Sequence, residues 1–568
     1  MKNSLYIDDF AIFYTSKNLR HIQRTLNIAI VKIDQWASSV GFKFSMEKTQ
    51  AIIFYRDKRW IKDQQIDLKF RDIPVRFYEN VKFLGLIFDQ HLNWKSHVNY
   101  VKTRALKAMN ILKKLSHTTW GADRKTMMTL YKATVLSIME YGSPIYSSAS
   151  DTILKSLDPV HHLGIRLATG AFRSSPTTSI LAESGELPLQ DRFEQISMQR
   201  ALKIKCSKSP TRELFIENNN NDNGKQKPPL PVRANKWFTD NQINTDLINT
   251  FEYTFPPWIR KISSSCKKLL HLSKRHLNDS VLKQLTEEHK NEHANSFSIY
   301  TDGSKTENGV GFAVVSERFK IQSSLPDNAS IYTAELTAIK AAIDNVIKFK
   351  VKNVTIFSDS QSAIKGIESY YTKHPIVLEI QAALHKLESN SMKVTLCWIP
   401  AHVGIKGNEE ADKAAKEAIN TPCTIRKIPC NDYISLIKKV TRNKWQVTWN
   451  NIPLTNKLRN IKDTTYKWSS SLQKERLNEV LLARLRIGHT NITHGHLMCT
   501  PHEPPPICDT CLVELTVKHI LIECEKFSRI RPRNFREKSL KEIIGEGENF
   551  SADMLFKFLK NCHLINKI

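Results

Sequence analysis

The stretch Phe297-Ser298-Ile299-Tyr300-Thr301-Asp302-Gly303-Ser304 alternates apolar and polar residues and then reaches a glycine. Alternation with a period of two is typical of a strand that buries one face. Two further strand-like runs follow at 309–315 and 319–325, so the three segments predict an antiparallel meander. An aspartate therefore stands at the end of the alternating run.

Residues 331–349 carry apolar side chains at helical spacing, and Glu335 heads the stripe that continues through Ile339 and Ile343. A carboxylate on a buried face is costly unless it is paired or binds a metal. We therefore expect Glu335 to belong to a site.

The next segments repeat the alternation of strand and helix. A β-branched strand at 354–359 ends in Asp359, a helix is predicted at 374–387 and a strand at 394–399. A glycine-rich loop at 400–407 leads to a helix at 409–419, which Asn408 could cap and which carries Asp412 in its first turns. The pattern predicts an α/β domain over residues 296–420.

Four carboxylates thus lie on four elements: Asp302, Glu335, Asp359 and Asp412. Each alone could be turn chemistry, a helix-surface acid or a first-turn acid. Gathered together they would need cations, and an all-oxygen set suits Mg²⁺ or Mn²⁺. Two such ions, ~3.5–4 Å apart, can clamp both reacting oxygens of a phosphodiester.

Four motifs resemble the ribonuclease H family in order and spacing, and most closely the ribonuclease H of jockey-like non-LTR retrotransposon polyproteins. They are Tyr300-Thr301-Asp302-Gly303-Ser304, Thr333-Ala334-Glu335-Leu336, Phe357-Ser358-Asp359-Ser360 and Trp398-Ile399-Pro400-Ala401-His402-Val403-Gly404-Ile405-Lys406-Gly407-Asn408-Glu409-Glu410-Ala411-Asp412.

The resemblance implies a ribonuclease H-like five-stranded mixed sheet with flanking helices. It also implies cleavage of the RNA strand of an RNA–DNA hybrid by two Mg²⁺ held by the four carboxylates. His402 falls on the family's loop histidine, with a role in proton transfer or product release, although an isolated loop histidine would be ordinary surface. Ser304 and Asn408 are candidate substrate contacts by position alone.

Near the N-terminus, Tyr6-Ile7-Asp8-Asp9 lies between apolar runs and predicts a hairpin with two acids at its tip. With the segments 41–49 and 83–86 it resembles the last part of a reverse transcriptase palm, so Asp8 and Asp9 would be a remnant polymerase metal site. Only five residues precede Tyr6, and a third palm carboxylate is missing. We therefore expect no polymerase activity from this chain alone.

Cys508, Cys511, His519 and Cys524 follow the spacing C-x₂-C-x₇-H-x₄-C, which suits a tetrahedral Zn²⁺. Free thiols with a histidine on a helix face are the alternative, and Cys499 is a possible substitute ligand. The cluster resembles the tail of the same polyproteins. Arg529, Arg531, Arg533 and Arg536 follow it and could contact phosphates. The other six cysteines are scattered, and free thiols are their simplest interpretation.

The formal charge of +28 predicts a polyanionic partner. Residues 296–420 hold 14 basic and 14 acidic residues, whereas residues 1–295 hold 45 and 28 and residues 421–568 hold 25 and 14. Two basic flanks around a neutral nuclease-like module favour nucleic acid over ordinary surface lysine. No apolar run approaches the ~20 residues of a membrane helix. We expect an intracellular protein, and the resemblance favours the nucleus.

The predicted domains are a partial palm at 1–95, a helical thumb and connection at 96–205, a linker and connection at 206–295, the ribonuclease H domain at 296–420, and a basic helical zinc-knuckle-like tail at 421–568. Two other functions stay open: a fragment of a full RNA-directed DNA polymerase, and a catalytically inactive nucleic-acid-binding relic. The sequence leaves the oligomeric state open.

Overall fold

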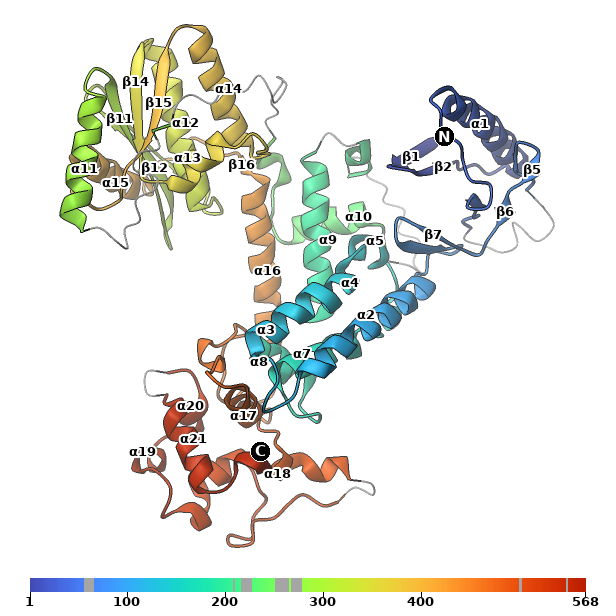
Figure 1. Ribbon diagram of the computed structural model, residues 1–568, viewed down its shortest axis with the longest axis vertical. Helices are drawn as coiled ribbons and strands as arrows, with labels where there is room; N and C mark the ends of the chain where they lie inside the picture. Colours follow the sequence, from blue (N-terminus) through green and yellow to red (C-terminus); the bar gives the residue numbers. More distant parts are fainter. Residues whose placement is uncertain are drawn as a thin grey trace. The chain divides into compact units, whose positions relative to one another are not determined.

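The computed structural model describes residues 1–55, 66–207, 210–215, 227–250, 265–266, 278–499, 503–547 and 550–568. The polar run 217–224, predicted to be a linker, lies outside these residues. The chain forms two compact units (Figure 1). The first comprises Met1–Ser197, Asn221–Leu230 and Thr441–Ile568, and the second comprises Met198–Asn220 and Pro231–Val440.

The second unit is built on one mixed sheet. Three strands form the predicted antiparallel meander: β11 (Phe297–Thr306), β12 (Gly309–Ser316) and β13 (Lys320–Leu325). On the other side of β11 lie the parallel strands β14 (Asn353–Ser358) and β15 (Lys393–Trp398). The five strands predicted for residues 296–420 are therefore confirmed, and the sheet gains a sixth from outside that range. A two-residue strand, β10 (Ser265–Cys266), pairs in parallel with β15, and the order is β10-β15-β14-β11-β12-β13.

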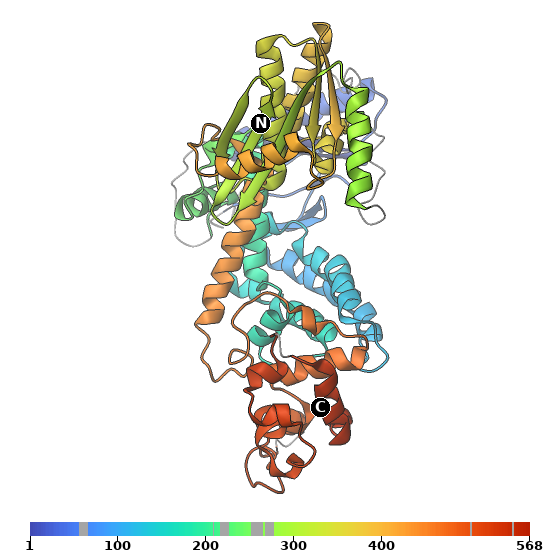
Figure 2. The ribbon, with the colours of Figure 1, turned by 90° about the vertical axis from the view of Figure 1, so that its left-hand side faces the viewer.

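Helices cover both faces of this sheet because its strands are apolar on both sides. Ile299 and Ile356 pack with α12 (Ile331–Phe349), α13 (Gln361–Glu368) and α14 (Pro375–Ser389). Their chain neighbours Tyr300 and Phe357 face the other way and pack with α11 (Asp279–Glu292) and α15 (Lys406–Ala418). Figure 2 shows α11 standing alongside the sheet.

Of the two helices that carry acidic residues of the predicted site, one begins where the sequence predicts and the other does not. Helix α12 has the predicted limits, and Ser330 caps it by accepting a hydrogen bond from the Thr333 backbone NH. Helix α15 begins at Lys406, with Ile405 as its N-cap, so the expectation that Asn408 caps this helix was wrong. Asn408 lies inside the first turn and is buried, because its amide faces the end of β14 instead of solvent.

The N-terminal part of the first unit contains short elements around a small core of Leu68, Phe70 and Val75. The predicted hairpin is present as β1 (Lys2–Tyr6) and β2 (Asp9–Phe13). The other elements are α1 (Leu19–Ser39), the strand pair β3 (Gln50–Ala51) with β6 (Arg76–Phe77), the pair β4 (Lys69–Phe70) with β5 (Ile73–Pro74), and the pair β7 (Asn80–Phe83) with β8 (Leu86–Asp89).

Helices make up most of the remaining structure. Helix α2 spans Lys95–Leu115, and α3 (Arg124–Leu130) passes through a π-helical stretch, Tyr131–Leu136, into α4 (Ser137–Glu140). The others are α5 (Ser143–Tyr146), α6 (Asp151–Lys155), α7 (Asp158–Thr169), α8 (Thr177–Ser184), α9 (Leu189–Lys205), α10 (Leu230–Asp240), α16 (Cys430–Asn450), α17 (Arg476–Ile487), α18 (Asn491–His494), α19 (Arg533–Arg536), α20 (Leu540–Ile544) and α21 (Ala552–Asn561). None of the helices in the described ranges combines the length and apolarity that crossing a membrane needs.

The C-terminal helices share one hydrophobic core with the helices after β8. Trp449 and Leu481 pack in the same cluster as Met109 and Tyr131. A buried ion pair also joins the two segments, since Glu183 receives Arg124 at 3.0 Å and lies 3.9 Å from Arg486. The segments predicted as thumb and tail therefore belong to one folded unit, which their separation in sequence did not indicate.

Candidate active site

Three carboxylates from three elements meet at one edge of the sheet. Asp302 lies on β11, Glu335 lies in the second turn of α12, and Asp359 directly follows β14. One carboxylate oxygen of each lies within 4.8 Å of those of the other two. Adjacent parallel strands deliver the aspartates, because Thr301 stands opposite Ser358 in the register of β11 and β14.

Gly303 allows Glu335 to lie close to the aspartates. A Cβ at Gly303 would lie 2.7 Å from the backbone nitrogen of Glu335 and 2.8 Å from the Cβ of Ala334. Only a residue without a side chain lets α12 pass so close to β11. The Asp-Gly pair at 302–303 therefore supplies both a carboxylate and the space for its neighbour.

The environment of these acids disfavours their charged forms. Burial, and then the charges of Asp359 and Asp412, raise the pKa of Asp302 to about 7. Burial, and then the charges of Asp302 and Asp359, raise the pKa of Glu335 to about 9. The Oε2 atom of Glu335 is buried and has no hydrogen-bond partner. A divalent cation would satisfy this oxygen and offset the repulsion among the three groups.

Asp359 has its own supports. Burial raises its pKa, and the side-chain amide of Asn408 opposes this by donating a hydrogen bond from Nδ2 to Oδ2 at 3.4 Å. The indole Nε1 of Trp398 donates to the backbone oxygen of Asp359 at 3.0 Å. Sequence reasoning missed both contacts. The Trp398 contact could have been predicted, because Trp398 lies at the end of the strand next to the one that Asp359 follows.

Asp412 stands outside the group of three, although the sequence analysis expected four acids together. It lies on α15, where its carboxylate pairs with Lys416 at 2.7 Å and its side chain is 23% exposed. Its charge still raises the pKa of Asp302 and of Asp359, so it lies near the group of three. Asp412 could complete a second cation site if the Lys416 pair opened.

The remaining residues predicted for this site lie near it with fewer contacts. His402 is exposed in the loop before α15 at φ +57°, and its charge lowers the pKa of Asp359. Ser304 lies two residues beyond Asp302 on β11 and is 8% exposed. His402 is therefore accessible to an approaching ligand, whereas Ser304 is buried within the sheet.

The N-terminal acids are arranged differently. Asp8 and Asp9 lie at the turn between β1 and β2, where Ile7 adopts φ +56°, and both side chains are exposed. Among the described residues, no group of three potential metal ligands includes either of them.

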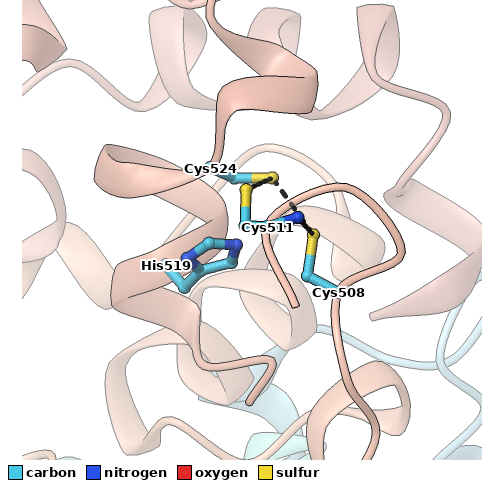
Figure 3. A group of neighbouring side chains, drawn as sticks. All are labelled: Cys508, Cys511, His519 and Cys524. Carbon is cyan, nitrogen blue, oxygen red and sulfur yellow. Dashed lines mark hydrogen bonds between the residues drawn. The ribbon is translucent and has the colours of Figure 1, made fainter. Parts of the chain in front are cut away.

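The four residues predicted to bind zinc do come together. One ligand atom from each of Cys508, Cys511, His519 and Cys524 lies within 4.8 Å of the others (Figure 3). The Sγ of Cys508 is 3.7 Å from that of Cys524, and the Nε2 of His519 is buried without a hydrogen-bond partner. The backbone NH of Cys511, followed by the side chain of His519, lowers the pKa of the Cys508 thiol to about 6. Three sulfurs and one imidazole suit a tetrahedral metal.

One arginine beside this cluster has a structural role. Arg531 is buried, and its guanidinium donates to the backbone oxygens of Leu521 and Cys524 at 3.0 and 2.6 Å. The expectation that Arg531 could contact phosphates was therefore wrong, because its guanidinium is buried against these backbone oxygens. Arg529, Arg533 and Arg536 are exposed.

Comparison with known families now gives these arrangements a context. Residues 294–420 match the family model RNase H, so this part of the chain is an RNase H domain, which confirms the resemblance seen in its motifs. The RNase H family generally uses divalent metal ions.

The relatives are retrotransposon proteins. The chain is 20% identical over 199 residues to the Retrovirus-related Pol polyprotein from type-1 retrotransposable element R1 4 of Nasonia vitripennis, which is 32% of this chain and 50% of that protein. It is 23% identical over 171 residues to the Probable RNA-directed DNA polymerase from transposon X-element of Drosophila melanogaster, which is 29% of this chain and 18% of that protein. The match thus spans half of the first relative and less of the second.

Among solved structures, RNase H1 from the halophilic archaeon Halobacterium salinarum NRC-1 matches 22% of this chain and 98% of its own. The two are 22% identical, with a TM-score of 0.19.

Proposed function

We propose that this chain cuts the RNA strand of RNA–DNA hybrids by hydrolysis, with two divalent ions of the Mg²⁺ or Mn²⁺ class held at the edge of the RNase H sheet. The observation that carries the proposal is the group of Asp302, Glu335 and Asp359, whose carboxylate oxygens lie within 4.8 Å of one another. An all-oxygen donor set of this kind suits hard divalent cations.

The roles of the acids follow from their surroundings. Asp302 and Glu335, whose pKa values are raised to about 7 and about 9, would give up protons as cations enter. Asp359, oriented by Asn408, would reach the same ions. Asp412 would exchange its contact with Lys416 for the second ion.

When bound, the two ions would supply Lewis-acid stabilisation of the attacking and leaving oxygens of the phosphodiester. The chain's own groups would do the rest. The carboxylates would hold the ions at the sheet edge, where the scissile phosphate would bind. The imidazole of His402, exposed beside Asp359, can exchange a proton with the departing product. The products would carry a 5′-phosphate and a 3′-hydroxyl.

Selection of RNA requires contacts to the 2′-hydroxyl. The amide of Asn408 and the hydroxyl of Ser304, which lie near Asp359 and Asp302, are our candidates by position. Asn408 acts on the site by positioning that carboxylate as well.

We also propose that the flanking regions hold nucleic acid. Residues 1–295 carry 45 basic and 28 acidic residues, and residues 421–568 carry 25 and 14. Excess positive charge binds phosphate backbones without regard to sequence. A Zn²⁺ bound by Cys508, Cys511, His519 and Cys524 would fix the loop that precedes the exposed Arg529, Arg533 and Arg536.

We further propose an evolutionary origin for the N-terminal residues. Residues 1–95 would correspond to the last part of a reverse transcriptase palm, with Asp8 and Asp9 at the tip of its hairpin. One of the relatives is named a probable RNA-directed DNA polymerase.

The nuclease is tested with the full chain, a hybrid labelled on its RNA strand, and Mg²⁺. We expect 5′-phosphate products from the hybrid and none from single-stranded RNA. Asp302→Asn and Glu335→Gln should each abolish cleavage, whereas Asp344→Asn on the exposed side of α12 should not, since its side chain is 50% exposed. Cleavage that survives Asp302→Asn and Glu335→Gln would reject the assigned site. Absence of cleavage by the unsubstituted chain would reject the function.

A further inference from the structure

A third group of potential metal ligands lies in the second unit, away from the carboxylates. His289 on α11, His293 at the C-cap of that helix and Cys397 on β15 each place one ligand atom within 4.8 Å of the other two. The Sγ of Cys397 is 3.9 Å from the Nε2 of His289. Neither histidine lies within the matched residues 294–420, so the group joins the RNase H domain to the helix before it.

The helix aims both imidazoles at the sheet. His289 and His293 are four residues apart, which places them on one helical face. Leu282 and Thr286 continue that face toward the N-terminus and are buried. His289 is 4% exposed and Cys397 is 0% exposed.

A carboxylate orients one of the imidazoles. The Oε2 of Glu292 lies 3.1 Å from the Nδ1 of His289, so the neutral ring carries its proton on Nδ1 and donates it there. The lone pair on Nε2 then faces the Cys397 sulfur. A carboxylate behind a histidine is the usual second layer of a zinc site, where it fixes the tautomer and strengthens the ligand.

We propose that His289, His293 and Cys397 bind a Zn²⁺ ion that fastens α11 to the sheet. Two imidazole nitrogens and one thiolate form a donor set for zinc and not for Mg²⁺, which prefers oxygen. With Zn–S near ~2.3 Å and Zn–N near ~2.0–2.1 Å, a tetrahedral site needs the sulfur and nitrogen roughly 3.5 Å apart. The observed 3.9 Å closes to that by a movement of a few tenths of an ångström, about the size of side-chain adjustments.

The site would be structural. Its sulfur belongs to Cys397 on β15. The residue that follows Cys397, Trp398, donates its indole NH to the backbone oxygen of Asp359. Zinc would therefore hold in place the strand that supports a carboxylate of the candidate nuclease site. This inference does not depend on that nuclease being active.

The test is the zinc content of the full chain, purified from zinc-supplemented cells without a metal-binding tag and dialysed. We expect two zinc ions per chain, one here and one at Cys508, Cys511, His519 and Cys524. Cys397→Ala and His293→Asn should each lower the content by one ion. The exposed cysteine variant Cys423→Ala is the matched control and should keep both. Zinc content unchanged by Cys397→Ala and His293→Asn would overturn the proposal.

A second measurement avoids variants that could fail to fold. Glu292→Gln changes a half-exposed carboxylate beside His289, and Glu288→Gln changes an exposed one on the same helix that accepts a hydrogen bond from Gln284. During titration with a competing chelator, Glu292→Gln should release one of the two ions at about 10–100-fold lower chelator activity. Glu288→Gln should release both as the unsubstituted chain does. Identical release curves for the two variants would refute the site.

Discussion

The Nδ2 of Asn408 donates a hydrogen bond to the Oδ2 of Asp359 at 3.4 Å, which joins the first turn of α15 to the end of β14. The bond lowers the pKa of Asp359, against the burial that raises it. Asn408 is therefore a positioning residue: it favours the charged form of a carboxylate and holds it in the group formed with Asp302 and Glu335.

Replacing this amide should weaken cation binding more than it weakens turnover. In Asn408→Ala, Asp359 loses the donor that favours its charged form, so the Mg²⁺ concentration for half-maximal cleavage should rise about 10-fold, as for other groups that orient a metal ligand. The rate at saturating Mg²⁺ should fall less. Glu410→Gln, exposed on the same helix, is the control. An unchanged Mg²⁺ dependence in Asn408→Ala would show that the bond does not position Asp359.

Neutralising Glu335 should stabilise the cation-free protein while removing its activity. The pKa of Glu335 is raised to about 9 in the folded chain, so this group favours folding below its ordinary value of 4.5 and costs stability as pH rises toward 9. Glu335→Gln keeps the neutral form at every pH. In chelator at pH 8, we expect the free energy of unfolding to rise by roughly 1–3 kcal/mol.

Urea unfolding of the variant in chelator, followed across pH 5–9, tests this expectation. The gain should shrink toward pH 5, because Glu335 of the unfolded chain then approaches its ordinary pKa of 4.5 and protonating it on folding costs less. Asp344→Asn should give no gain. A loss of stability in Glu335→Gln at pH 8 would mean that the carboxylate is better satisfied than its surroundings indicate.

Adding one methyl group at Gly303 should disturb both the fold and the site. A Cβ there would lie 2.7 Å from the backbone nitrogen of Glu335, and neither backbone can move freely. Gly303→Ala should cost about 1–3 kcal/mol of stability, as overpacking does, and should displace Glu335 from the aspartates. Cleavage should drop by more than tenfold. Thr306→Ala, at the exposed end of the same strand, should leave both nearly unchanged.

His161 should make the first unit sensitive to acid. It is fully buried, its Nδ1 meets the hydroxyl of Tyr131 and its Nε2 meets the backbone oxygen of Leu187. Burial lowers its pKa to about 3. The folded state therefore holds the neutral ring, and stability present above the unfolded pKa of about 6.5 is lost as pH falls toward 3.

The loss should approach about 1.4 kcal/mol for each pH unit below 6.5. In His161→Gln this part of the pH dependence should disappear, at a cost of about 1–3 kcal/mol at pH 7 for the lost hydrogen bonds. Thermal unfolding between pH 4 and pH 7 measures both. His117→Gln, at an exposed histidine, should follow the unsubstituted chain, and a His161→Gln curve with the same slope would contradict the argument.

The buried ion pair of the first unit should tie its two sequence segments into one cooperative transition. Glu183 is 0% exposed and receives Arg124 and Ser471 through one oxygen. Glu183→Gln leaves two buried guanidinium groups without their counter-charge and should cost about 3–5 kcal/mol. Hydrogen exchange should then increase together in 124–184 and 471–487. Increased exchange in only one of these segments would show that they unfold separately.

The sequence by itself determined the domain that carries the chemistry. Period-two alternation placed β11, helical spacing placed α12 at 331–349, and the motifs around Asp302, Glu335 and Asp359 identified an RNase H domain. The spacing of Cys508, Cys511, His519 and Cys524 likewise foretold a cluster that does gather. These signals are local, because each depends on residues within one element or one short loop.

Tertiary structure decided what depends on contacts between distant segments. The sequence could not show that Asn408 faces Asp359, that Asp412 pairs with Lys416 outside the group of three, or that Arg531 satisfies backbone carbonyls. It also gave no sign that Cys397, predicted to be a scattered free thiol, meets His289 and His293. Burial and charge act through space, so the pKa of Glu335 and the partners of Glu183 exist only once the helices have packed.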